Sequence, residues 1–223
     1  MYTWEWGIIS QYQWVFIEGA LVTLCLTLLV VITGTLLGVA IGIIRPNLIF
    51  PFSLFIKIYI ELFRALPILV LLIWIYYVLP ILVDVRLSPF IAGYLALSIN
   101  LSAYVAETVR AGIEAIPKNQ YESGITLGFT RSQVMWRLIL PQAIRSMLPN
   151  LLGLYITQLK NSSLTSVIAV NELLHQSNSV ISNTYRPLEV YTAVAGIYVA
   201  IILPITFLCD HVERMLAKKT KQL

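Results

Sequence analysis

Polar side chains interrupt the apolar runs of this sequence at three places, and polar groups inside a membrane-like run usually face a bundle interior or a wet cavity. The stretch "QLKNSSLTS" places Lys160, Asn161, Ser162 and Ser163 in succession. Four consecutive polar residues cover every face of a helix, so they avoid lipid only where the segment is enclosed or partly unwound. An unwound turn beside a cavity exposes backbone dipoles and side chains to a polar solute. A purely structural role is the alternative for these residues.

The second place is the stretch "ELFRALPILV", which contains Arg64 and Pro67. Proline has no N–H and breaks the helical hydrogen-bond ladder, so a helix is expected to be interrupted there. Together with the 160–163 stretch, this break is where we expect a solute to pass. Pairing of Arg64 with Glu61 or with a lipid phosphate is the alternative.

The third place is a helical face on which Asn100 and Glu107 share the spacing of Ala96 and Ala103. Residues three and four apart lie on one side of a helix, so this face is a candidate cavity lining. The alternative is that Asn100 bonds a neighbouring helix and Glu107 pairs with Arg110.

The elements that must position these residues are membrane helices. The chain has 223 residues, 58% hydrophobic and 12% charged, with a mean hydropathy of +0.82. This composition excludes an ordinary soluble globule and is typical of polytopic membrane proteins. Backbone groups in lipid must be satisfied internally, which favours an all-α helical bundle. The length fits a single membrane domain over residues 1–223.

Five spans are predicted, at about 17–44, 50–80, 88–112, 146–170 and 189–211. In the first, Gly34, Gly38 and Gly42 recur every fourth residue and should allow close approach of another helix. The second is too long for one upright crossing, because its residues would reach roughly 46 Å at 1.5 Å each. Lys57, Glu61 and Arg64 can pair on one helix face near the interface. We expect a surface-lying or protruding entry followed by a kinked crossing.

The distribution of basic residues predicts the orientation. With the N-terminus outside, Arg86 and Arg186 face outward, whereas the 113–145 segment and the C-terminus are cytoplasmic. The basic residues on the cytoplasmic side would be Arg45, Arg110, Lys118, Arg131, Arg137, Arg145, Arg214, Lys218, Lys219 and Lys221. The basic tail is expected to bind anionic lipid rather than nucleic acid.

The segment 113–145 reads as two short helices that meet at a corner. A helix can begin after Pro117, and Gly128 stands where a left-handed C-terminal cap is wanted. Thr130 and Gln133 have the spacing of a capping box for a second helix. Pro141 is expected to bend or end that helix. The side chains directed toward the bundle would be Val134, Leu138 and Ile139.

This segment resembles the "EAA" loop of the permease subunits of bacterial ABC importers, whose pattern is E-A-A, three residues, G, nine residues, I-x-L-P. The pattern is kept at Glu122, Gly128, Leu140 and Pro141, and it is broken at Ser123, Gly124 and Leu138. Three further stretches, "LFRALPILVLLIWIYYVLP", "AYVAETVRAGIEAIPKNQ" and "LKNSSLTSVIAVNELL", resemble the polar amino-acid uptake branch of that family.

The resemblance implies a type I importer permease with five transmembrane helices in the bacterial inner membrane. Its implied partners are a second permease subunit, identical or a sister chain, two ABC ATPases, and an extracytoplasmic amino-acid-binding protein. ATP and Mg²⁺ would bind on the ATPases and no cofactor on this chain, which also lacks a G-x-x-x-x-G-K-[ST] phosphate loop. The residues implied to contact the ATPase are Tyr121, Glu122, Ser123, Gly124, Leu127 and Gly128.

The implied function is ATP-driven uptake of a polar amino acid, with acidic or neutral substrates favoured and basic ones possible. Arg64, Lys160, Ser162 and Ser163 offer donors for a carboxylate, and Asn100, Glu107 or free carbonyls offer acceptors for an ammonium. An ion-gradient-driven secondary transporter or channel is the alternative. An enzyme is not expected, because no nucleophile, base or metal cluster can be assembled from the sequence.

Overall fold

The fold of the chain was analysed in a computed structural model, which describes residues 2–44 and 49–220 and, within 216–220, only the backbone. The described residues form helices and contain no strand. The predicted lipid contacts of Lys218, Lys219 and Lys221, and the placement of Arg45, lie outside the described side chains. The helices are α1 (Gly7–Gln11), α2 (Gln13–Ile44), α3 (Phe52–Ala65), α4 (Ile68–Ile73), α5 (Leu79–Val83), α6 (Pro89–Glu114), α7 (Lys118–Thr126), α8 (Arg131–Val134), α9 (Leu140–Asn161), α10 (Leu173–Thr184) and α11 (Pro187–Thr220).

Within residues 2–44 and 49–220, three short irregular helices join some of these elements. A π-helical turn, Trp74–Val78, connects α4 to α5, and a second one, Met135–Ile139, connects α8 to α9. A 3₁₀ helix, Ser162–Ile168, follows α9 directly. The predicted unwinding of the 160–163 stretch therefore takes the form of a change from α-helix to the tighter 3₁₀ helix.

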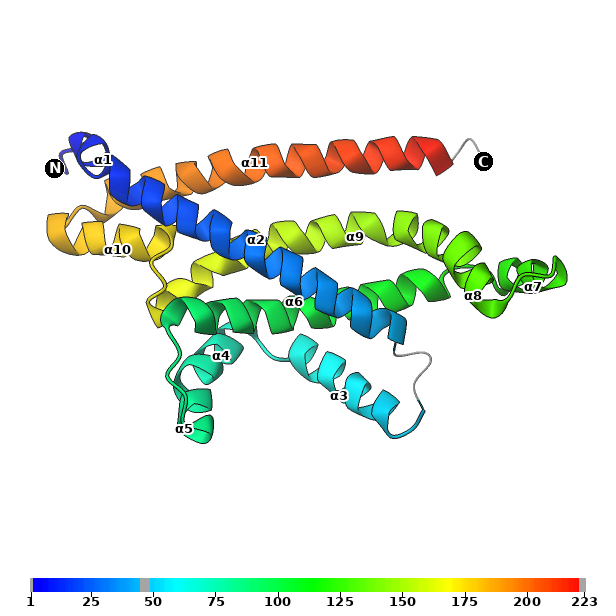
Figure 1. Cartoon of the computed structure of the whole chain (residues 1–223). Coiled ribbons are helices and arrows are strands. Elements are labelled where there is room, and N and C mark those ends of the chain that lie inside the picture. The colour runs from blue at the N-terminus through cyan, green and yellow to red at the C-terminus, as the bar shows by residue number, and fades with distance from the viewer. Residues whose placement is uncertain (1, 45–48, 221–223) are drawn as a thin grey trace.

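The long helices α2, α6, α9 and α11 run lengthwise through the molecule (Figure 1). Helices α7 and α8 project from one end of the bundle, and α11 finishes at that same end (Figure 1). We call it the projecting end. The N-terminus, α1 and α10 lie at the opposite end (Figure 1). The 113–145 segment and the end of α11 thus share one end of the bundle and α1 lies at the other, which is the relative placement that the sequence predicts.

In the part of the chain that the structure describes, three helices are long and apolar enough to cross a membrane: Gln13–Ile44, Pro89–Glu114 and Pro187–Met215. The pair Phe52–Ala65 and Ile68–Val83 becomes a fourth candidate if it is counted as one broken span, and the bend between its halves is 108°. The predicted span 146–170 corresponds to α9 and the 3₁₀ helix after it, which fall outside this apolar class. The count of five spans therefore stays a prediction.

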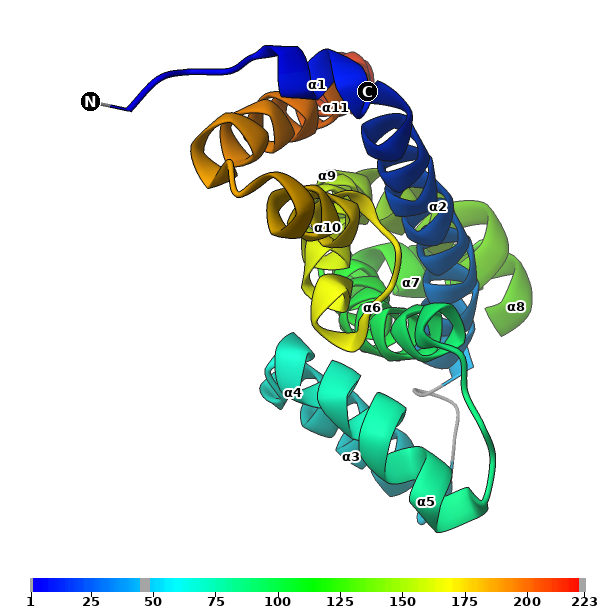
Figure 2. The same ribbon diagram turned by 90° about the vertical axis from the view of Figure 1, so that its left-hand side faces the viewer.

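Helix α6 lies at the centre of the bundle, with α2 on one side and the α3–α4 layer on another (Figure 2). The predicted glycine stripe on α2 makes the close approach. A Cβ added at Gly38 would lie 2.5 Å from Val105 Cβ, and one at Gly42 would lie 2.8 Å from Val109 Cβ. Val105 and Val109 are fully buried. Because lipid is as apolar as the helices, their association depends on such close packing rather than on exclusion of water.

The charged residues of α3 pair differently from the prediction. Lys57 Nζ lies 3.7 Å from Glu61 Oε1, as expected for residues four apart. The expected third member, Arg64, instead directs its guanidinium to Glu107 of α6, at 3.9 Å. Arg64 is in the last turn of α3, next to the break, and within reach of α6. The prediction that all three residues pair on one face of a single helix is therefore wrong.

The projecting hairpin α7–α8 has the predicted corner. Gly128 adopts a left-handed φ of +84° and its N–H donates to the Ile125 carbonyl at 2.9 Å. The Thr130 N–H donates to Gln133 Oε1 at 2.9 Å, and the Gln133 N–H donates to Thr130 Oγ1 at 3.3 Å, which completes the capping box. The sequence predicts that Pro141 bends or ends the helix; helical conformation continues through it after a π-helical turn, so the helix does not end there.

We expect the substitution Gly38→Ala to destabilise the bundle, because its methyl would also lie 2.6 Å from the Ser102 carbonyl oxygen on the α6 backbone. Overpacking of this kind costs about 1–3 kcal/mol. The measurement is the thermal unfolding midpoint of the purified chain in one detergent. Gly196→Ala on α11 is the matched control, since a Cβ there meets nothing within 4 Å. Equal midpoints for both variants would contradict the packing argument.

Candidate functional site

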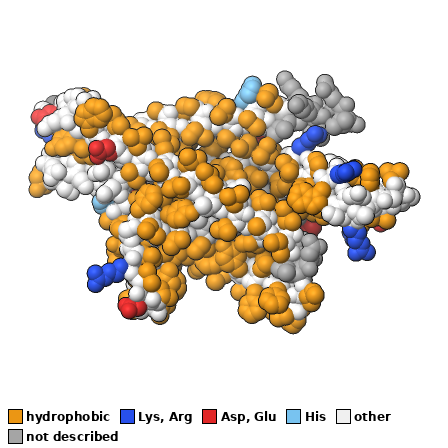
Figure 3. All heavy atoms as spheres, viewed as in Figure 1, with side chains coloured by type: hydrophobic (Ala, Val, Ile, Leu, Met, Phe, Trp, Pro, Cys, Tyr) orange, Lys and Arg blue, Asp and Glu red, His pale blue; other side chains and the backbone are white. Residues whose placement is uncertain are grey.

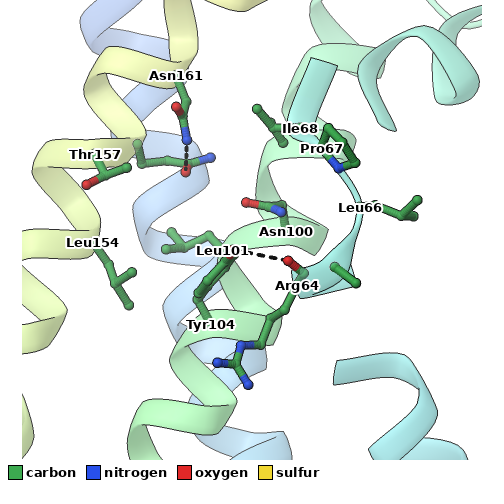
Figure 4. Close-up of a pocket in the computed structure, with 12 residues that line it drawn as sticks. Arg64, Leu66, Pro67, Ile68, Asn100, Leu101, Tyr104, Leu154, Thr157 and Asn161 are labelled. Atoms are coloured by element: carbon green, nitrogen blue, oxygen red, sulfur yellow. Dashed lines mark hydrogen bonds between the residues drawn. The ribbon is translucent and has the colours of Figure 1, made fainter. Parts of the chain in front are cut away.

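A cavity of about 370 Å³ opens beside the break between α3 and α4. Its wall is made by the break itself, by the middle of α6 and by the last two turns of α9 (Figure 4). The lining residues are Arg64, Ala65, Leu66, Pro67, Ile68, Asn100, Leu101, Tyr104, Leu154, Thr157, Gln158 and Asn161. The break and the end of α9, which are distant in sequence, therefore face one space.

The break exists because Pro67 cannot continue a helix and disfavours helical backbone at Leu66, whose ψ is 129°. The last carbonyls of α3 then lack partners in their own helix. Two side chains of α6 satisfy them. Asn100 Nδ2 donates to the Phe63 carbonyl at 2.9 Å, and the Tyr104 hydroxyl donates to the Arg64 carbonyl at 3.2 Å (Figure 4). Asn100 thus both bonds a neighbouring helix and lines the cavity.

A chain of charges leads from the cavity toward the projecting end. The Arg64 guanidinium lies over the Tyr104 ring, 5.5 Å from its centroid, and reaches Glu107 of the next turn. Arg110 donates from Nε and Nη2 to the two Glu107 oxygens at 3.0 and 2.6 Å, and its Nη1 also pairs with Glu114. The predicted Glu107–Arg110 pair is confirmed. The Glu107 carboxylate therefore pairs both with Arg64 of α3 and with Arg110, three residues further along α6.

The other wall is the end of α9. Gln158 Nε2 donates to the Leu97 carbonyl of α6 at 3.1 Å, and Asn161 Nδ2 donates to Gln158 Oε1 at 3.4 Å (Figure 4). The Thr157 side chain is exposed and stands across the cavity from the break. These amide and hydroxyl groups supply donors and acceptors opposite the Arg64 cation.

The predicted pathway residues divide into two groups. Four of them line the cavity: Arg64, Pro67, Asn100 and Asn161. The other four, Glu107, Lys160, Ser162 and Ser163, lie outside its lining. Lys160 is exposed, while the Ser162 hydroxyl is buried and donates to the Leu159 carbonyl at 2.7 Å. Ser163 likewise donates to the Lys160 carbonyl, at 2.8 Å. Both hydroxyls are used by the backbone of the α-to-3₁₀ transition.

Sequence reasoning missed three polar lining residues: Tyr104, Thr157 and Gln158. Helical spacing was a usable signal for two of them, because Tyr104 is four residues after Asn100 and Thr157 is four before Asn161. Gln158 is fully buried and holds α9 against α6. Nothing in the local sequence distinguishes it from the polar residues that follow.

Glu172 is a buried carboxylate for which the sequence predicted no role. Its side chain is 0% exposed, between the N-terminus of α10 and α11. It accepts from the N–H groups of Leu174 and His175 at 3.0 and 2.8 Å and from the Tyr198 hydroxyl at 2.9 Å. Burial raises the pKa of this carboxyl, and the three hydrogen bonds oppose that rise. Its contacts make it a helix cap that ties α10 to α11.

The predicted ATPase-contact residues all lie on the projecting hairpin. Glu122, Ser123, Leu127 and Gly128 are exposed, Tyr121 is half-buried, and Gly124 is buried. A Cβ at Gly124 would lie 2.8 Å from Leu138 Cδ1 and 2.8 Å from Val134 Cγ2. Gly124 and Leu138, two positions that depart from the EAA pattern, are therefore in contact with each other. The absent methyl group at one position leaves room for the leucine at the other.

Comparisons with known proteins agree with this architecture. Residues 34–221 match the family described as "Binding-protein-dependent transport system inner membrane component". The chain is 40% identical to a probable amino-acid ABC transporter permease protein, y4tF, of Sinorhizobium fredii, covering 88% of this chain and 84% of that protein. It is 35% identical to the glutamine transport system permease protein GlnP of Escherichia coli K12, covering 94% and 96%.

A solved structure, the crystal structure of an amino acid ABC transporter with histidines, matches with a TM-score of 0.90 at 38% identity, covering 96% of this chain and all of that one. A methionine ABC transporter in an inward-facing conformation matches at 20% identity with a TM-score of 0.77, which shows the shared fold. The chain is therefore a membrane-spanning permease subunit, not an enzyme, and it belongs to the family of inner membrane components of binding-protein-dependent transport systems, with the type I ABC importer permease fold.

Proposed function

We propose that this chain forms half of the pathway for ATP-driven uptake of a polar amino acid, which a substrate-binding protein delivers. The observation that carries the proposal is the cavity at the broken helix, where one cation, backbone carbonyls and amide side chains face the same space. The names of the y4tF and GlnP relatives, an amino-acid and a glutamine permease, support this substrate class.

The lining of the cavity favours acidic or neutral amino acids over basic ones. Arg64 is the charged member of the lining that the structure describes, and its charge is positive. A substrate carboxylate can accept hydrogen bonds from the guanidinium, while Asn161 and Thr157 provide acceptors for an ammonium group. A second cation on a basic substrate would be repelled by Arg64.

Helix α6 is suited to carry motion between the cavity and the projecting hairpin. It places Asn100 and Tyr104 at the break, Glu107 beside Arg64, and its last residue, Glu114, four residues before α7 begins. A packed helix moves as a rigid body rather than bending smoothly. Displacement of the hairpin would therefore shift the cavity wall and the Arg64–Glu107 contact together.

The energy for transport would come from two separate ABC ATPase subunits, which bind ATP and Mg²⁺ and contact the exposed face of α7. The projecting end would then be cytoplasmic and the N-terminal end outside, in agreement with the distribution of basic residues. A second permease subunit would complete the pathway. In support of this, only 6% of the most apolar window of α11 is buried within this chain, so the helix is free to contact lipid or a partner.

The test of this function is uptake by proteoliposomes that contain the chain, its ATPase and its binding protein. We expect uptake of glutamine or glutamate to require ATP and to fall to background in Glu122→Gln, because Glu122 is exposed on α7 where the ATPase would bind. Glu213→Gln, an exposed carboxylate at the same end of the bundle, is the control and should transport normally. Uptake driven by an ion gradient without ATPase would overturn the proposal in favour of a secondary transporter or channel.

Replacement of Arg64 by Gln should weaken substrate handling in the cavity. Loss of one charge-assisted hydrogen bond corresponds to about a tenfold loss of affinity, so we expect a comparable rise in the substrate concentration at half-maximal uptake. Lys57→Gln is the matched control on the same helix, because Lys57 is exposed and pairs only with Glu61 among the described residues. Equal behaviour of the two variants would remove Arg64 from the pathway.

The contact between Gly124 and Leu138 predicts a coupled pair. The Gly124→Ala methyl should be better tolerated when Leu138→Ala removes the side chain it meets, with a favourable coupling energy of about 1 kcal/mol. The measurement is the opening free energy of the hairpin amides by hydrogen exchange in wild type, both single variants and the double variant. Additive effects, with no coupling, would show that the two residues do not constrain each other.

A further inference from the structure

A second hollow, of about 380 Å³, lies between the projecting hairpin and the ends of the long helices α2 and α6. It is separate from the cavity at the α3–α4 break, with which it shares no lining residue. The lining residues are Ile43, Ile113, Tyr121, Arg131, Ser132, Met135, Trp136 and Leu140. We call it the hairpin pocket. Of the residues predicted to contact the ATPase, Tyr121 alone is in this lining.

The hairpin pocket has a polar side and an apolar side. Arg131 and Ser132, both exposed, form the polar side at the start of α8. The apolar side is formed by Ile43 of α2, Ile113 of α6 and Leu140 of α9. A site of this composition fits an amphiphile with a polar head and a hydrocarbon tail.

Arg131 brings an unmatched positive charge to the hairpin pocket. Among the residues that the structure describes, the lining contains no acidic one. The Arg131 side chain makes no ion pair or hydrogen bond with the side chains of residues 2–44 and 49–215 or with the described backbone. Other Lys and Arg side chains also gather at the projecting end (Figure 3). The complementary ligand is therefore an anion, and a planar guanidinium is well matched to the oxygens of a phosphate group.

The hairpin pocket lies beside the ends of two helices that are long and apolar enough to cross a membrane. The apolar run of α2 ends at Ile44, directly after the lining residue Ile43, and α6 ends at Glu114, directly after Ile113. Trp136, which is 61% exposed, and Tyr121 are in the same lining. Trp and Tyr rings favour the headgroup level of a bilayer. We therefore expect the pocket to lie near the headgroup level of the bilayer.

We propose that the hairpin pocket binds one anionic phospholipid from the adjacent leaflet. Its phosphate accepts hydrogen bonds from the Arg131 guanidinium and the Ser132 hydroxyl, and the indole N–H of Trp136 lies beside the headgroup. One acyl chain packs on Ile43, Ile113 and Leu140. A zwitterionic lipid binds less well, because its ammonium group adds a positive charge beside Arg131.

This lipid would contact both the hairpin and the ends of the spanning helices. Tyr121 belongs to α7, whereas Ile43 and Ile113 belong to the ends of the spanning helices. An occupied pocket therefore fills the space between the hairpin and the bundle and holds their relative position. Coupling of the hairpin to the cavity should consequently depend on anionic lipid, and this consequence alone rests on the proposed function.

The experiment uses the full chain, purified with the subunits that accompany it, in nanodiscs that contain a trace of photoactivatable phospholipid. The reactive group is on the acyl chain, and the headgroup is either phosphatidylglycerol or phosphatidylcholine. We expect phosphatidylglycerol to label peptides that contain Met135, Trp136 or Leu140 about tenfold more than phosphatidylcholine does, as one charge-assisted contact would give. Equal labelling by both lipids, or no labelling of these peptides because a partner subunit covers them, would overturn the proposal.

Two matched pairs of variants locate the headgroup. Arg131→Ala should lose the preference for phosphatidylglycerol, whereas Arg137→Ala, an exposed arginine of the same segment outside the lining, should keep it. Ser132→Glu should reduce labelling by phosphatidylglycerol, and the uncharged Ser132→Gln should reduce it less. Excess inorganic phosphate should not compete. Displacement by free phosphate, or equal loss in both arginine variants, would show an unspecific anion effect and refute a lipid site.

Discussion

The close contact of α2 with α6 is the constraint on which the rest of the structure depends. In lipid, two apolar helices gain nothing from leaving water, so only shape complementarity holds them together. The glycines of α2 leave room for Leu101, Val105 and Val109 of α6 to pack against the α2 backbone. With α2 held against it, α6 is buried over most of its length and becomes the scaffold on which the α3–α4 break, α9 and the hairpin are placed.

The polar groups of the cavity follow from the broken helix. A helix end inside a membrane leaves carbonyl groups that lipid cannot satisfy. Asn100 and Tyr104 of α6 donate to the carbonyls of Phe63 and Arg64, so the break is stable and still borders an open cavity. The same helix carries Glu107, which draws the Arg64 guanidinium toward the projecting end. The residues that stabilise the break and the residue that pairs with Arg64 therefore lie on neighbouring turns of α6.

The hairpin connects this scaffold to the space outside the bundle in two ways. Its exposed face, with Glu122, is available to a partner protein, while its inner face packs through Gly124 on Val134 and Leu138. The side that lines the hairpin pocket with the ends of α2 and α6 carries Arg131, which has no ionic partner among the described side chains. Protein partner and lipid would thus contact different faces of the same short element.

The sequence alone determined the features that depend on a few neighbouring residues. Apolar runs located the long helices, Gly128, Thr130 and Gln133 predicted the corner of the hairpin, Pro67 predicted the break, and the EAA pattern indicated the family. Only the tertiary structure decided which groups these polar side chains meet. Arg64 pairs with Glu107 rather than with Glu61, Tyr104 lines the cavity, and Gln158 holds α9 against α6. The hydroxyls of Ser162 and Ser163 bond the backbone of their own segment. The physical reason is that helix-forming signals act over a few residues, whereas a side chain in the membrane takes whichever polar group another helix brings within reach.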